Sequence, residues 1–226
     1  MSEAALTPST RVRDSLRSSS LAQAIAFLFI LAGALVFMPI AAALILLWAW
    51  LSKTPFADLG LARPKSWVGG LAIGIVLGVG LKFLLKAVVL PLLHAPPVNA
   101  TFHDIAGNPL ALAEFLAYVI VGAGFSEELV YRGYLFERLG KLIGKGALAT
   151  IATVVITTAL FAVSHWQQGI FGIVNAGITG IAVALVYLAC RRRLFVPMVM
   201  HAAFDITAAA MIYLNLETEV SHLVFK

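Results

Sequence analysis

Six long apolar runs constrain this chain more than any other feature of its sequence. Each run has about 20 or more mostly uncharged residues, the length that an α-helix needs to cross the hydrocarbon core of a membrane. Hydrophobic residues make up 61% of the chain and charged residues 12%, against roughly 25% charged residues in soluble domains. We therefore predict an all-α, polytopic transmembrane bundle of about six to eight helices. The runs are Leu21–Leu51, Trp67–Leu93, Pro109–Leu135, Ala147–His165, Gly169–Cys190 and Leu194–Leu214.

The first apolar run is long for one crossing of the membrane and short for two. Gly33 and Pro39 lie inside it, and residues of these types kink or break helices. Basic residues flank the run on both sides, which places both of its ends on the same side of the membrane. We therefore predict a tight helical hairpin in this run.

Lysine and arginine residues alternate between successive connections. The connections 52–66, 136–146 and 191–193 are basic, whereas 94–108 and 166–168 contain no Lys or Arg. This alternation follows the positive-inside rule, so the basic connections are predicted to face the cytoplasm. The expected location is the bacterial inner (plasma) membrane, as an integral protein.

A single domain accounts for the apolar part of the chain. Residues 21–214 are predicted to form one transmembrane catalytic domain. Residues 1–20 are polar and Ser-rich and are expected to be a mobile tail, and residues 215–226 a short C-terminal tail. One cysteine, Cys190, allows no internal disulfide and no cysteine-based metal site.

The segment "GFSEELVYRGYLFERL" places two adjacent glutamates, Glu127 and Glu128, inside an apolar run. A charge in hydrocarbon is strongly unfavourable, so such residues are functional candidates. Arg132 follows Glu128 by four residues, with the acid first, which is the favourable order for a pair on a helix. Glu127 has Tyr131 at that spacing and no cation, which makes it a candidate general base. The alternative is that this helix end emerges at the polar membrane surface.

Two later runs add ionisable residues at a comparable depth. His165 ends its run, and counting along two antiparallel helices brings it level with Glu127. His201 and Asp205 are four residues apart, so both leave one face of the last helix. The structural alternatives are an interfacial anchor for His165 and a self-contained pair for His201 and Asp205.

Small residues on the second run indicate close helix packing. Gly70, Gly74 and Gly78 recur every four residues, a spacing that lets helix backbones approach each other in lipid. Lys82 and Lys86 follow on the same helix and are interpreted as side chains that extend to the membrane interface.

The order of the polar motifs resembles that of a known family. The motifs "EELVYR", "FAVSH" and "HAAFD" follow one another on successive predicted helices. They are similar to the E-E-x-x-x-R, F-x-x-x-H and H-x-x-x-N/D motifs of the CPBP family, the intramembrane glutamate proteases that include CAAX proteases and bacteriocin-processing (Abi) proteins. The stretch Asp58–Trp67 is also similar, and the resemblance extends from Phe56 to Ala210.

This resemblance implies a CAAX prenyl endopeptidase-like intramembrane glutamic protease, a hydrolase acting on peptide bonds. Glu127 would be the general base that activates a water molecule together with His165. His201 and Asp205 would line the oxyanion position. Asp205 departs from the asparagine that is common in the family, so it would donate a hydrogen bond only when protonated and would otherwise orient His201.

The same resemblance implies that Glu128 and Arg132 shape the site as a pair, with neither a metal nor another cofactor. The expected partners are the lipid bilayer and a membrane-delivered peptide, lipidated or prenylated at a CAAX-type end. No nucleic acid is expected to bind.

Three other functions remain open from the sequence. In a zinc-dependent membrane protease, Glu127, His165 and His201 would bind Zn²⁺, with Asp205 supporting or completing the set. The chain has no H-E-x-x-H motif. A proton-coupled transporter would use the same residues as a relay, and a protease-like scaffold would only bind a partner, as an immunity protein does.

Overall fold

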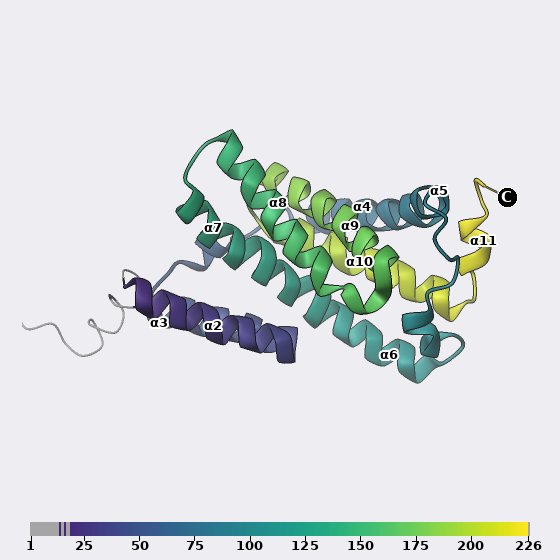
Figure 1. The fold of residues 1–226 in the computed structure, drawn as a ribbon, viewed down its shortest axis with the longest axis horizontal. Helices are drawn as coiled ribbons and strands as arrows, with labels where there is room; N and C mark the ends of the chain where they lie inside the picture. The colour runs from purple at the N-terminus through teal and green to yellow at the C-terminus, as the bar shows by residue number, and fades with distance from the viewer. Residues whose placement is uncertain (1–13, 15, 17–18, 226) are drawn as a thin grey trace, which may run out of the picture.

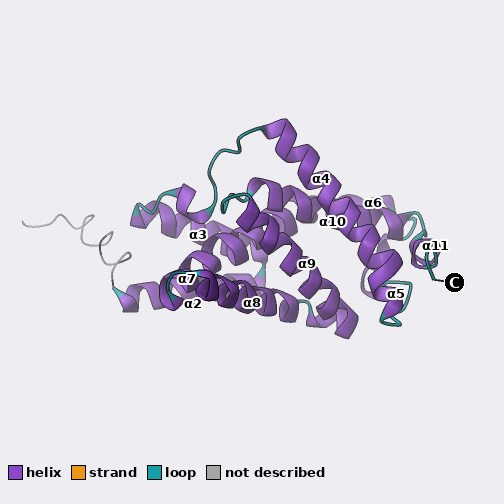
Figure 2. Cartoon of the chain, turned by 90° about the horizontal axis from the view of Figure 1, so that it is seen from above, coloured by secondary structure: helices purple, strands orange, loops and turns teal. Residues whose placement is uncertain are grey.

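The computed structural model describes residues 14, 16 and 19–225, which form a helical bundle without strands (Figures 1 and 2). In this part of the chain, five helices are long and apolar enough to cross a membrane, and two shorter apolar helices precede them. The prediction of an all-α transmembrane protein is confirmed. Most of the tail predicted at residues 1–20 lies outside the described residues.

The helices follow the predicted apolar runs with small shifts at their ends. The α-helices are α2 Ser20–Val36, α3 Met38–Ser52, α4 Trp67–Leu84, α5 Leu90–Leu92, α6 Pro109–Tyr118, α7 Phe136–Ile143, α8 Ala147–Ser164, α9 Gly169–Ala189, α10 Phe195–Tyr213 and α11 Glu217–Ser221. Three further segments are π-helical, η2 Leu85–Val89, η4 Val119–Glu127 and η5 Leu129–Leu135. The 3₁₀ turns are η1 Phe56–Leu59, η3 Ala100–Ile105 and η6 Trp166–Gln168.

The first apolar run forms the predicted hairpin, with α2 and α3 side by side along one edge of the bundle (Figure 1). The break falls at Phe37, which is extended with φ −165°, and Pro39 lies in the first turn of α3. Proline is tolerated there because the N–H that it lacks has no partner inside a helix. A Cβ on Gly33 would lie 3.1 Å from the Leu44 side chain, so glycine at this position lets the two helices touch.

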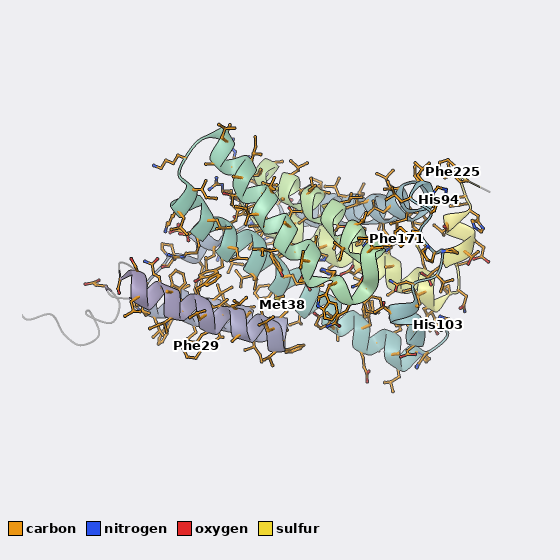
Figure 3. The ribbon with its side chains drawn as sticks, in the orientation of Figure 1. Phe29, Met38, His94, His103, Phe171 and Phe225 are labelled. Atoms are coloured by element: carbon orange, nitrogen blue, oxygen red, sulfur yellow. The ribbon has the colours of Figure 1, made fainter. Side chains whose placement is uncertain are left out.

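The outer surface of the hairpin is apolar. Phe29 on α2 points away from the bundle (Figure 3) and is 65% exposed. An exposed side chain of this kind suits contact with lipid chains rather than with water.

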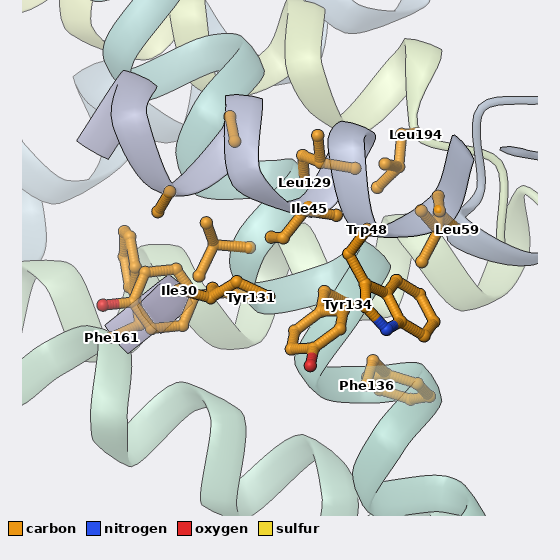
Figure 4. Close-up of a cluster of buried hydrophobic side chains, with 14 of the residues drawn as sticks. Ile30, Ile45, Trp48, Leu59, Leu129, Tyr131, Tyr134, Phe136, Phe161 and Leu194 are labelled. Carbon is orange, nitrogen blue, oxygen red and sulfur yellow. The ribbon is translucent and has the colours of Figure 1, made fainter. Parts of the chain in front are cut away.

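Aromatic side chains pack together where α3, η5 and α8 meet (Figure 4). The rings of Trp48 and Tyr134 are 5.5 Å apart, and those of Tyr131 and Phe161 are 5.2 Å apart. Both pairs are edge-to-face, a geometry that adds about 0.5–1.5 kcal/mol beyond the burial of the rings. This cluster fixes the hairpin and α8 against the helix that carries the two glutamates.

The basic connections meet at one end of the bundle. The Leu194 N–H donates to the Gly60 carbonyl at 2.9 Å, and the Arg193 guanidinium donates to the Arg63 carbonyl at 3.0 Å. The connection 94–108 lies at the opposite end, beside α11 (Figure 1). This arrangement agrees with the alternation of charge along the sequence, and the cytoplasmic side of the bundle stays a prediction.

Helices α4 and α10 lie side by side and touch through glycines (Figure 2). A Cβ on Gly74 would lie 2.5 Å from the Val199 side chain, and one on Gly78 would overlap the Met200 carbonyl oxygen. The predicted close packing is confirmed. Because Met200 precedes His201, the fit of α4 against α10 sets the position of the helix turn that carries this histidine.

A buried ionic cluster ties the C-terminal residues to the bundle. Glu217 Oε1 accepts hydrogen bonds from Lys86 Nζ at 3.1 Å and from the Asn99 N–H at 3.0 Å, and Lys86 also donates to the Pro97 carbonyl. We call these four residues the Lys86 cluster. The interpretation of Lys86 as a side chain that extends to the interface is wrong, because its charge is balanced inside the protein.

Candidate active site

The two glutamates lie on a π-helical stretch of a single long helix. Backbone hydrogen bonding of the i→i+5 type runs through η4 and η5, and the Ser126 hydroxyl likewise donates to the carbonyl of Val121, five residues earlier, at 2.5 Å. The α-helix predicted from the sequence for this segment is therefore wrong in its hydrogen-bonding pattern. Such π-helical turns are rare and are frequent at functional sites.

Glu128 is completely buried and firmly held. Its Oε1 accepts a hydrogen bond from Arg132 at 3.1 Å and lies 2.7 Å from His201 Nδ1. Arg132 is also buried, donates to the Gly180 carbonyl at 3.0 Å and lies 4.6 Å from the centre of the Phe161 ring. The predicted pairing of Glu128 with Arg132 is therefore present, and it joins the π-helical stretch to α9 and α10.

Glu127 is also buried but is held less tightly. Its Oε2 lies 3.9 Å from His201 Nε2, which is beyond hydrogen-bonding distance, and it has no hydrogen-bond partner among the described residues. Glu128 Oε2 also has no hydrogen-bond partner among the described residues, yet the other oxygen of Glu128 binds two partners. A buried polar atom without a partner costs about 1–3 kcal/mol, so its presence in a folded protein requires a reason such as catalysis.

His201 lies between three carboxylates. Its Nδ1 contacts Glu128, while its Nε2 lies 3.6 Å from Asp205 Oδ2 and 3.9 Å from Glu127 Oε2. Because an ionised carboxylate only accepts hydrogen bonds, Nδ1 carries a proton toward Glu128 and Nε2 faces the other two acids. We call Glu127, Glu128, Arg132 and His201 the site cluster. The contact between His201 and Glu128 was not predicted, because it joins residues 73 positions apart.

His165 follows the end of α8 at the border of the site. Its Nδ1 lies 2.8 Å from the Phe161 carbonyl oxygen, so Nδ1 donates to that carbonyl when the imidazole is neutral and Nε2 is left as an acceptor. Burial lowers the pKa of His165 below its usual value, which favours the neutral ring. In the described part of the chain, no hydrogen bond or ion pair joins His165 to Glu127, and His201 is the histidine beside this glutamate.

Comparison with known proteins gives one match. Residues 109–207 match the family model described as "Rce1-like: Type II CAAX prenyl endopeptidase Rce1-like". Residues 109–207 are thus similar to the Rce1-like family. This description names a CAAX prenyl endopeptidase, so the match indicates a peptide-bond hydrolase of this type and agrees with the resemblance to the CPBP proteases. No curated protein and no solved structure matches the chain.

The Rce1-like segment contains all the predicted site residues and one that sequence reasoning left without a role. Phe161 contacts the two histidine rings, with centroid distances of 4.7 Å to His165 and 5.6 Å to His201, and it also lies against Arg132. The F-x-x-x-H motif contained the signal for this residue. Phe161 fixes the relative position of the two histidines.

The side chains of the zinc alternative are not arranged as a metal-binding set. Among residues 19–225, no group of three or more His, Cys, Asp or Glu side chains is placed to hold a metal ion. His201 Nδ1 is engaged by Glu128, which leaves only Nε2 of this ring to bind a metal. The geometry thus gives this alternative no ligand set, and the expectation that no cofactor takes part stays a prediction.

Proposed function

We propose that this protein is an intramembrane endopeptidase in which Glu127 activates a water molecule for attack on a peptide carbonyl. The observation that carries the proposal is the difference between two adjacent glutamates. Glu128 is bonded to Arg132 and His201, whereas Glu127 Oε2 has no partner among the described residues. A general base needs an oxygen that is free to take a proton from water.

His201 and Asp205 are proposed to serve the oxyanion of the tetrahedral intermediate. His201 Nε2 lies on the Glu127 side of the ring, so a protonated imidazole can donate to an oxyanion that forms next to the base. Asp205, at 3.6 Å from Nε2, orients this ring when it is ionised and can itself donate when it is protonated. The cation of Arg132 pairs with Glu128, and Glu128 in turn fixes the His201 ring.

His165 is proposed to hold the attacking water together with Glu127. Its Nδ1 is engaged by the Phe161 carbonyl, so Nε2 is the atom left to accept a hydrogen bond from water. The shared contact with Phe161 supports this role, because that ring lies against both histidines.

The proposed substrate is a peptide delivered by the membrane, with a prenylated CAAX-type end as the first candidate. Five candidate spans and a site buried among them support delivery through the bilayer. The proposed setting is a bacterial plasma membrane, with the basic end of the bundle in the cytoplasm in accordance with the positive-inside rule.

Cleavage of a fluorogenic prenylated peptide by detergent-purified protein tests this function. Wild type and Glu127→Ala are each assayed with and without a strong zinc chelator. We expect wild-type cleavage that the chelator leaves unchanged, and a loss of about 100-fold or more in Glu127→Ala. Glu114→Ala is the matched control, because Glu114 is an exposed glutamate on the same long helix and its loss should not affect cleavage.

Two results contradict this mechanism. Cleavage abolished by the chelator in wild type would make the protein a metalloprotease. Cleavage by Glu127→Ala at the wild-type rate would remove Glu127 as the base.

A further inference from the structure

If the proposed function holds, a peptide with a CAAX-type end brings an additional negative charge into this site. Its C-terminal carboxylate must enter the bundle, where an unpaired charge is strongly unfavourable. The site already contains three carboxylates, those of Glu127, Glu128 and Asp205. A further carboxylate therefore requires a cation that these acids do not occupy.

Two of the buried cations near the site are already engaged. Arg132 is bonded to Glu128 and to the Gly180 carbonyl. Lys86 is bonded to Glu217 and to the Pro97 carbonyl, within the Lys86 cluster. The charge of each of these side chains is thus already balanced by an acid of the protein.

A half-buried cation, Lys82, is not engaged in this way. Its ammonium group makes no hydrogen bond or ion pair with any residue that the structure describes. Its one polar contact there is with an aromatic face, since Nζ lies 4.7 Å from the centre of the Phe204 ring. A cation–π contact holds an ammonium group in place and leaves its N–H donors free.

Lys82 is also placed beside the site. It follows Gly78 by one helix turn, on the face of α4 that touches the Met200 turn of α10. Phe204, whose ring Lys82 contacts, precedes Asp205 on α10. The ammonium group therefore lies next to the outer part of the site, one turn along α10 from His201.

The distances suit a short C-terminal fragment. Phe204 follows His201 by three residues, which is about 5 Å along a helix. An extended tripeptide spans roughly 10 Å. A substrate with its scissile carbonyl at His201 can therefore extend past Asp205 to Lys82 with the three residues that follow the cleaved bond of a CAAX-type end.

We propose that Lys82 binds the C-terminal carboxylate of the substrate and so selects peptides with a free C-terminus close to the cleaved bond. Lys82 is thus a specificity residue of the endopeptidase, distinct from the groups that perform the hydrolysis.

Binding of two farnesylated peptides tests the proposal. Both have the sequence Cys(farnesyl)-Val-Ile-Ala with an N-terminal fluorophore, and they differ only in ending in a free carboxylate or a primary carboxamide. Fluorescence polarisation measures their affinity for three detergent-purified proteins. All three contain Glu127→Gln, and they have Lys82, Lys82→Gln or Lys82→Arg. Lys65→Gln is the matched control, because it removes the same charge from an exposed lysine in a basic connection.

With Lys82 present, the carboxylate peptide should bind about tenfold tighter than the amide, equivalent to about 1.4 kcal/mol. Lys82→Gln should bring this ratio close to one by weakening the carboxylate peptide alone. Lys82→Arg should keep a preference for the carboxylate, and Lys65→Gln should leave the ratio unchanged. An unchanged affinity for the amide peptide shows that each variant is folded.

The proposal is overturned if Lys82→Gln keeps the wild-type ratio, if protein with Lys82 binds both peptides equally, or if it binds neither. The readout is binding, so it does not depend on which residue is the base. Undiminished cleavage by Glu127→Ala would contradict the proposed mechanism, and the affinity ratio would still decide the role of Lys82.

Discussion

Two buried ionic clusters of this bundle differ in how completely their polar atoms are satisfied. In the Lys86 cluster, the carboxylate oxygen of Glu217 and the ammonium group of Lys86 each have two partners within the protein. In the site cluster, Glu128 is bonded twice, but Glu127 Oε2 has no partner among the described residues. The two clusters have similar burial and similar chemistry.

We interpret this difference as a difference in role: the Lys86 cluster holds the structure, and the site cluster performs chemistry. A buried ion pair adds little net stability, yet removing one of its partners is strongly destabilising. The Lys86 cluster therefore fixes α11 and the connection 94–108 against η2. The site cluster contains the same kind of pair and, next to it, an oxygen left available for reaction.

The largest effect is expected from Glu127→Gln, which changes the unpaired acid alone. Cleavage of the prenylated peptide should fall by about 100- to 10,000-fold in kcat/KM, because the amide cannot take a proton from water. Circular dichroism should show an unchanged helical content. Glu114→Gln is the control, and retention of more than a tenth of wild-type activity by Glu127→Gln would remove the distinction between the two glutamates.

Arg132→Met should destabilise the protein by about 3–5 kcal/mol, because Glu128 would be left as a buried charge without its cation. Urea or thermal unfolding in detergent measures this loss. Arg132→Met combined with Glu128→Gln should recover part of it, since both charges are then removed. A double variant less stable than the single one would show that the pair is not the source of the effect.

Lys86→Met should also destabilise, by about 3 kcal/mol, for the same reason at Glu217. Lys86→Met and the variants of the site cluster should differ in their effect on activity. The rate of cleavage per folded molecule should stay within about twofold of wild type, because no residue of the Lys86 cluster contacts the site cluster through a hydrogen bond or ion pair among the described residues. A loss of kcat as large as that of Glu127→Gln would place the Lys86 cluster in the reaction. It would contradict the distinction between a structural and a catalytic cluster.

A smaller effect is expected where α4 supports the site. Gly78→Ala should destabilise by about 1–3 kcal/mol, because the new methyl group would overlap the Met200 carbonyl and push α10 away. Peptide cleavage should fall with it, as His201 moves. Gly80→Ala is the matched control, since a Cβ there has no atom within 4 Å, and equal effects of the two substitutions would contradict this account of the packing.

The sequence predicted the features that depend on short-range spacing. Pro39 indicated the break in the first apolar run, and the i,i+4 spacing predicted the pairing of Glu128 with Arg132. The glycines of α4 predicted its close packing. Each of these follows from residues within a few turns of one helix, where geometry is fixed by the backbone.

The remaining features depend on how distant helices pack, which spacing within one helix cannot predict. The bond between His201 and Glu128 joins residues 73 positions apart, and the pair of Lys86 with Glu217 spans 131 positions. The π-helical stretch changed the geometry around Glu127, and no local pattern indicated it. Counting along the helices placed His165 level with Glu127, but it did not indicate that the His165 ring contacts Phe161.

The most direct test of the central claim compares the thermal unfolding of Glu127→Gln and Glu128→Gln in the same detergent. The two substitutions are chemically identical and affect adjacent residues. We predict that Glu127→Gln unfolds within about 2 °C of wild type, whereas Glu128→Gln unfolds about 6 °C or more below it, taking about 3 kcal/mol and roughly 2–4 °C per kcal/mol for a chain of this size. Equal losses in both variants, or a larger loss in Glu127→Gln, would contradict the account, because the two carboxylates would then be held alike.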